Sequence, residues 1–142
     1  MGEQIDKAST IFNAIILGTA LIALIVGGFS IINTMIMSIS ERTKEIGIKK
    51  ALGASSWAIA REYTLEAGVI GFLGGAIGMG IGLTLIYIFN AKMAEKGAEI
   101  FLVSPGFLIG VVAFSFGLGI LAGVIPANRA ARMKAVDAIR EL

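Results

Sequence analysis

The hydrophobic positions of the chain fall into three long runs that contain no charged residue. These runs cover residues 8–39, 67–91 and 100–128, and short charged segments separate them. About 20 consecutive apolar residues in a helix are enough to cross the hydrocarbon layer of a bilayer. The pattern therefore predicts an all-α, polytopic membrane protein with three transmembrane helices, over about residues 9–39, 56–91 and 105–125.

Polar residues and prolines near the ends of the runs indicate where the helices start and stop. Ser9 or Thr10 is a plausible N-cap for the first span. Ser104 followed by Pro105 predicts the start of the third, because serine suits the N-cap and proline the first helical position. Pro126 is expected to end or kink that helix, because it lacks the backbone N–H that a helix interior uses.

The longest charged segment, residues 40–66, joins the first two spans. Its composition favours a short helix over about residues 41–52, which Gly53 would end, because glycine readily adopts the left-handed conformation. Ser55 or Ser56 can then cap the second span. A short, stiff helix between two membrane helices is the predicted result.

The short helix carries apolar groups on two sides. At 100° per residue Ile48, Ala51 and Leu52 share one face. The opposite side carries one apolar and three basic residues, namely Arg42, Ile46, Lys49 and Lys50. Such a helix can be held between two surfaces, or it can be an ordinary solvated loop helix whose charges only set the topology. Helical periodicity leaves both interpretations open.

Glycines recur at helical spacing in the second and third spans. Small residues four apart let helix backbones approach closely, which is how helices associate in lipid. The partner helix can belong to this chain or to another subunit. The residues predicted to pack helices in this way are Gly71, Gly74, Gly75, Gly78, Gly82, Gly106, Gly110, Gly119 and Gly123.

Composition limits the chemistry that the chain can carry out. Hydrophobic residues make up 56% and charged residues 15%, and cysteine and histidine are absent from the sequence, which excludes disulfides, zinc clusters and histidine-based catalysis. The sequence has no phosphate-binding G-x-x-x-x-G-K-[ST] motif, and a net charge of +2 does not favour nucleic acid as a partner. We predict no catalytic, cofactor-binding or metal-binding residues. The energy for any movement must come from another protein.

The distribution of Lys and Arg predicts the orientation. Nine of the 12 lie in residues 40–66 and in the basic tail, residues 127–142. Because positive charge accumulates on the inner side, we expect both segments to be cytoplasmic and the N-terminus to lie outside the cell (plasma or inner) membrane.

Two stretches resemble a known family. Residues 40–54, SERTKEIGIKKALGA, resemble the signature of FtsX-like, MacB-type permease subunits of ABC transporters. The sequence PANRAAR from Pro126, followed by DAIR from Asp137, is similar to the C-terminal motif of that family. Two departures lie in the tail: Ala135 stands where the family commonly has proline, and Asn128 where a basic residue is frequent.

The resemblance implies a permease subunit with four transmembrane helices and an outer domain between the first two. This chain matches the last three helices, so we expect it to be part of a longer protein. The family also implies two permease subunits, a cytoplasmic ATPase, and a coupling helix that docks on that ATPase. Carried onto this sequence, the ATPase-coupling residues are Glu41, Arg42, Lys44, Glu45, Ile46, Ile48, Lys49 and Leu52.

The expected function is to transmit ATP-driven motion across the membrane for export or extraction of a substrate. Two alternatives use the same architecture. The first is a transmembrane signal relay that controls cell-wall hydrolases. The second is a plain membrane anchor or assembly subunit, in which the charged loop only fixes the topology.

Overall fold

The computed structural model describes residues 2–94 and 103–133. In these residues the chain forms four α-helices: α1 (Gly2–Glu41), α2 (Thr43–Ala51), α3 (Ser56–Ala94) and α4 (Pro105–Arg132). The three long helices are each long and apolar enough to cross a membrane. The predicted all-α fold, with three candidate spans and a short helix between the first two, is confirmed.

The long helices expose most of their large apolar side chains. Phe12 and Leu17 on α1 are 65% and 67% exposed, and Ile109 on α4 is 72% exposed. A water-soluble protein rarely leaves such continuous apolar surface uncovered. These surfaces suit contact with lipid tails, so the chain is a multi-pass membrane protein.

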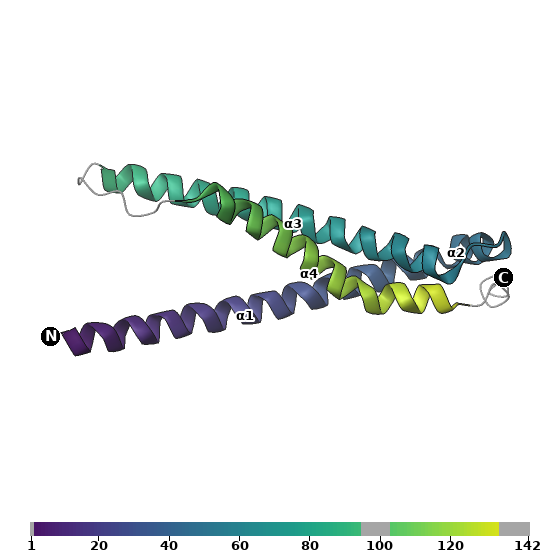
Figure 1. Ribbon diagram of the computed structural model, residues 1–142, viewed down its shortest axis with the longest axis horizontal. Helices are drawn as coiled ribbons and strands as arrows, with labels where there is room; N and C mark the ends of the chain where they lie inside the picture. The colour runs from purple at the N-terminus through teal and green to yellow at the C-terminus, as the bar shows by residue number, and fades with distance from the viewer. Residues whose placement is uncertain (1, 95–102, 134–142) are drawn as a thin grey trace.

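The helices converge at the end of the molecule that carries α2. Figure 1 shows α3 and α4 packed side by side, while α1 diverges from them towards its N-terminus. The buried core lies where the helices meet. It takes Met35 and Ile39 from α1, Ile46 from α2, Ile59, Tyr63 and Ala67 from α3, and Ala127, Ala130 and Ala131 from α4.

Glycines bring α3 and α4 into backbone contact. A Cβ atom built on Gly119 would lie 2.5 Å from the carbonyl oxygen of Ala67 and 3.1 Å from the Cα of Gly71. A Cβ on Gly71, Gly75 or Gly123 would also overlap atoms of the facing helix. The close approach of α3 and α4 therefore depends on the absence of side chains at these positions.

The other predicted packing glycines make no such contact within the described residues. A Cβ on Gly74, Gly78, Gly82 or Gly110 would meet nothing within 4 Å, and one on Gly106 would meet only the Oγ of Ser104 at 3.8 Å. Their role in packing against a helix of another subunit stays a prediction.

The first helix begins earlier than the predicted Ser9. It already includes Gly2, and an ion pair of 3.0 Å joins Lys7 to Glu3 one turn away. The Thr10 hydroxyl donates a hydrogen bond of 2.9 Å to the Asp6 carbonyl, so Thr10 lies inside the helix and does not cap it. The sequence predicted a start near Ser9 because Ser9 and Thr10 suit an N-cap, whereas residues 2–8 already form part of the helix.

The last helix continues past Pro126 and ends at Arg132, so the predicted end at residue 125 is wrong. Pro126 is fully buried, and Ala127 and Ala130 next to it are 0% exposed. Small side chains on this turn let α4 pack closely against the other helices, which offsets the hydrogen bond that proline cannot donate. Residues 127–132 of the predicted tail are helical, and its remainder from residue 134 lies outside the described residues.

Candidate partner-docking site on the short helix

The short helix α2 has defined ends on both sides. Arg42, with φ −101° and ψ 15°, separates it from α1. Gly53 follows it with φ 94°, in the left-handed region that glycine favours, which confirms the predicted terminator. The Ser55 hydroxyl then accepts a hydrogen bond of 3.2 Å from the backbone N–H of Ala58 and caps α3. A one-residue break at Arg42 and a turn at Gly53 thus separate α2 from the two long helices.

One face of α2 belongs to the core of this chain. Ile46 is 0% exposed and Gly47 is buried beside it. Ile46 was predicted as a contact for an ATPase, but its side chain packs in the core and is not accessible to a partner. The reason is that α3 and α4 lie on the side of α2 that carries Ile46 and the basic residues.

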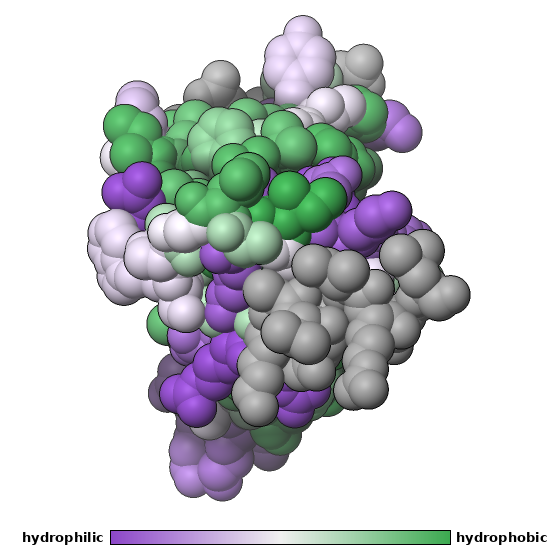
Figure 2. Space-filling view, turned by 90° about the vertical axis from the view of Figure 1, so that its right-hand side faces the viewer, coloured by the Kyte–Doolittle hydropathy of each residue, from purple (hydrophilic) through white to green (hydrophobic). Residues whose placement is uncertain are grey.

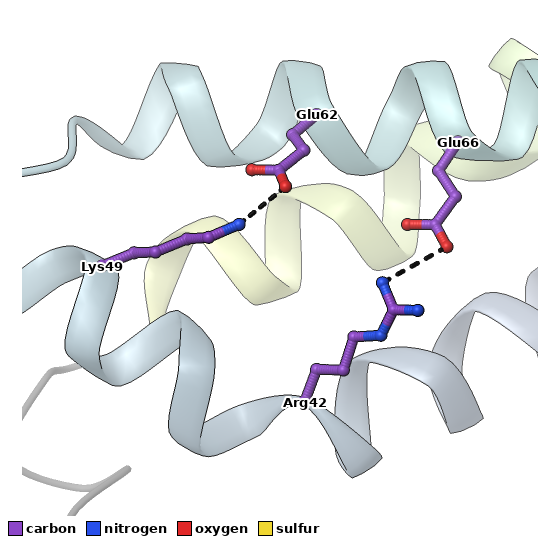
Figure 3. A network of polar contacts seen from close by, with 4 residues as sticks. All are labelled: Arg42, Lys49, Glu62 and Glu66. Atoms are coloured by element: carbon purple, nitrogen blue, oxygen red, sulfur yellow. Dashed lines mark hydrogen bonds and ion pairs between the residues drawn. The ribbon is translucent and has the colours of Figure 1, made fainter.

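Two ion pairs attach this segment to the start of α3, as Figure 3 shows. The Nζ atom of Lys49 lies 2.6 Å from Oε1 of Glu62, and Nη1 of Arg42 lies 3.7 Å from Oε1 of Glu66. The hydrogen bond to Glu62 raises the pKa of Lys49 above its ordinary value of 10.5. Two of the three predicted coupling cations, Arg42 and Lys49, are thus paired within the chain.

A third cation, Lys50, connects α2 to the end of α4. Its ammonium group donates hydrogen bonds to the carbonyl oxygens of Ala131 and, at 2.7 Å, of Met133. A cation is favourable here, because the last carbonyl groups of a helix carry partial negative charge. Lys50 was placed by the sequence pattern on the basic side of the short helix as a polar contact for a partner, but its contact with α4 was not predicted. Its partners lie more than 80 residues away in the sequence, so no local signal indicated them.

The opposite face of α2 is open. Ile48 is 46% and Leu52 85% exposed, and Lys44, Glu45 and the preceding Glu41 are exposed as well. Lys44, Ile48 and Leu52 recur every four residues and so lie on one side of the segment. Figure 2 looks onto this end of the molecule and shows hydrophobic and hydrophilic side chains next to one another.

An aromatic and a basic side chain add to the exposed surface near α2. Trp57, on the first turn of α3, is 69% exposed, and the guanidinium of Arg61 lies 5.0 Å from the centre of its ring. Apolar groups with charges of both signs around them can bind a protein surface through a hydrophobic centre and a polar rim. Five of the predicted coupling residues are exposed and form no ion pair among the described residues, namely Glu41, Lys44, Glu45, Ile48 and Leu52. Arg42 and Lys49 also reach solvent but form ion pairs with α3, and only Ile46 is buried.

Comparisons with known proteins agree on the relatives of this chain. Residues 17–135 match the family model described as FtsX-like permease C-terminal. The chain is 36% identical over 139 residues to the macrolide export ATP-binding/permease protein MacB of Neisseria gonorrhoeae. This alignment covers 98% of the chain and 21% of that relative. It is 38% identical over 136 residues to an ABC transporter permease of Bacillus subtilis, in an alignment that covers 96% of the chain and 33% of that permease. An ABC transporter permease of Methanocaldococcus jannaschii is 34% identical over 143 residues, in an alignment that covers 99% of the chain and 36% of that permease. The chain thus spans only about a fifth to a third of the length of these relatives.

Proposed function

The chain belongs to the family of FtsX-like permease C-terminal domains, and on that premise we propose a function for it. It is the transmembrane domain of an ABC transporter permease of the MacB type. A cytoplasmic ATP-binding subunit or domain docks on α2, and ATP-driven motion passes through α2 into the long helices. This motion serves to export a substrate or to extract it on the far side of the membrane.

The observation that carries the proposal is the division of α2 into two faces. A coupling element must offer a partner an accessible surface and must also be fixed to the parts that it moves. Ile48 and Leu52 are exposed on one face. On the other face Ile46 is buried, and Lys49 and Lys50 bind α3 and α4. A solvated loop helix that only sets the topology has no need of this attachment.

Relatives support the assignment of the energy source. The name of the Neisseria protein joins an ATP-binding part and a permease part. The present chain aligns with 21% of that protein. We therefore place ATP hydrolysis in a separate domain or subunit that the matched region does not include.

The proposed orientation follows from the basic residues. Segment 40–66 and the C-terminus are cytoplasmic, and the N-terminus lies outside. A second permease subunit is the proposed partner for the open glycines of α3, because Gly74, Gly78 and Gly82 have space above them for another helix.

The test of this function is coupling in the complete transporter. Leu52→Asp and Ile48→Asp place a charge in the proposed contact without disturbing the core, because both side chains are exposed. We expect ATP hydrolysis to become independent of the permease, while the protein still assembles in the membrane. Ala58→Asp, an exposed position on α3, is the matched control. Full coupled activity in both α2 variants would exclude the assignment.

A further inference from the structure

A small pocket lies where α1, α2 and α4 converge. Its volume is about 170 Å³. One wall comes from α1 and the start of α2, and the other from the end of α4. The lining residues are Ile36, Ile39, Ser40 and Thr43 on the first wall, and Pro126, Arg129, Ala130 and Met133 on the second.

The pocket is apolar apart from one cation. The Ser40 hydroxyl donates to the carbonyl of Ile36 at 2.8 Å, and the Thr43 hydroxyl donates to the carbonyls of Ile39 and Ser40 at 3.1 and 2.9 Å. Both hydroxyl hydrogens are thus used within the helices. Arg129 is the one charged residue in the lining, and it is exposed. No carboxylate in residues 2–94 or 103–133 forms an ion pair with it.

The pocket lies where two of the uncharged runs end. The first uncharged run of the sequence ends at Ile39, and the third ends at Asn128, directly before Arg129. Both ends therefore meet at this pocket, and its walls pass from lipid-facing to water-facing residues. If the uncharged runs mark the hydrocarbon layer, the apolar part would lie at the depth of the lipid tails and the guanidinium of Arg129 at the depth of the phosphate groups.

We propose that this pocket binds an anionic phospholipid of the inner leaflet. Part of one acyl chain lies against Ile36 and Met133, the two apolar lining residues that are not buried, and the phosphate pairs with Arg129. A guanidinium binds phosphate through two parallel hydrogen bonds, and basic pockets between membrane helices on the cytoplasmic side suit anionic headgroups. The exposed Arg132, one turn further along α4, adds positive charge. The proposal rests on the proposed orientation, which puts this end of α1 and α4 on the cytoplasmic side, and it does not depend on an ATP-binding partner at α2.

Lipid binding by the full chain in a non-ionic detergent tests this proposal. Native mass spectrometry gives the dissociation constants for dioleoylphosphatidylglycerol and for dioleoylphosphatidylcholine. We expect the anionic lipid to bind about fivefold or more tightly than the zwitterionic one. Arg129→Gln should remove this preference. Arg61→Gln should retain it, because Arg61 is an exposed arginine that stacks on Trp57 and does not line the pocket.

A second variant tests the pocket itself and leaves the charge in place. Ile36 is 38% exposed, so Ile36→Trp can fill the space without unfolding the core. It should weaken phosphatidylglycerol binding as Arg129→Gln does. Equal losses in Arg129→Gln and Arg61→Gln would overturn the proposal, because they would indicate diffuse surface charge. Displacement of the lipid by equimolar inorganic phosphate would also overturn the proposal. So would tighter lipid binding after truncation at Met133, because it would indicate that residues 134–142 occupy the pocket in the full chain.

Discussion

The ammonium group of Lys50 on α2 donates a hydrogen bond of 2.7 Å to the carbonyl oxygen of Met133, directly after the last residue of α4. This contact joins the short helix to the end of the third long helix. Together with the pair between Lys49 and Glu62, it attaches α2 to both α3 and α4. These contacts are the path by which the proposed motion of α2 would reach both helices.

Replacement of Lys50 by methionine should loosen the end of α4. Methionine keeps most of the side-chain length but cannot donate to the carbonyls of Ala131 and Met133. A hydrogen bond from a charged group contributes about 1.5–3 kcal/mol. We expect a loss of about 1–3 kcal/mol in the free energy of unfolding and faster amide hydrogen exchange in the last turn of α4.

The matched control for this change is Lys44→Met. Lys44 is exposed on α2 and forms no hydrogen bond or ion pair with α4 among the described residues. Lys44→Met should leave the free energy of unfolding and the amide exchange in the last turn of α4 unchanged. Exchange rates that rise equally in the two variants would contradict a specific role of Lys50.

The ion pair between Lys49 and Glu62 should make a small contribution to stability that depends on pH. The hydrogen bond to Glu62 raises the pKa of Lys49 in the folded chain above 10.5, its value when unfolded. The contribution is therefore fully present below pH 10.5 and disappears as the pH rises through the raised pKa. Because the two side chains are 42% and 53% exposed, we expect only about 0.2–1 kcal/mol.

Thermal unfolding of the wild type and of Lys49→Met, measured from neutral to strongly alkaline pH, checks this expectation. The difference in stability between the wild type and Lys49→Met should stay constant as the pH rises to about the pKa of an unfolded lysine, and it should shrink above that pH. A difference that grows with alkaline pH would contradict the assigned sign.

A methyl group on Gly119 should separate α3 from α4. Its Cβ would lie 2.5 Å from the carbonyl oxygen of Ala67, and both are held by helix backbone that cannot yield locally. Overpacking of this kind costs about 1–3 kcal/mol. Gly119→Ala should therefore lower the unfolding temperature in detergent.

Gly78→Ala provides the comparison within the same helix pair. An added Cβ there meets nothing within 4 Å, so the isolated chain should keep or slightly gain stability. If Gly78→Ala destabilised the chain as much as Gly119→Ala, general helix effects rather than close contact would explain the result.

Truncation to alanine should destabilise the chain far more at Ile46 than at Ile48. Ile46 is 0% exposed, and removal of a buried isoleucine side chain costs about 2–5 kcal/mol. Ile48 is 46% exposed, so Ile48→Ala should change stability by less than about 0.5 kcal/mol. Thermal unfolding of both variants in the same detergent gives the comparison. Similar losses would show that α2 is not oriented as described.

The spans and the turns around α2 could be predicted from the sequence because their signals are local. An uncharged run of lipid-spanning length gives each long helix, and Gly53 and Ser55 mark the end of α2 and the start of α3. The spacing of the glycines also indicated a packing face, but it could not distinguish Gly119, which contacts α3, from Gly110, which has open space. That choice depends on where two helices cross.

The inward face of α2 could not be predicted from the sequence. Periodicity placed Ile46 and Ile48 on different sides, but it did not indicate which side the long helices would cover. The contact of Lys50 with the end of α4 depends on residues far apart in the chain. Pro126 was expected to end or kink the third span because its local effect is to disrupt a helix, whereas α4 continues past the buried Pro126 to Arg132.

Cross-linking from single cysteines tests most directly whether the exposed face of α2 receives the ATP-binding partner. The sequence contains no cysteine, so an introduced one is the only reactive thiol that this chain provides. In membranes that contain the complete transporter, Leu52→Cys should cross-link to the ATP-binding domain, and Ile46→Cys should not. Labelling of Leu52→Cys by a membrane-impermeant reagent added outside intact cells, without any cross-link to that domain, would contradict the account.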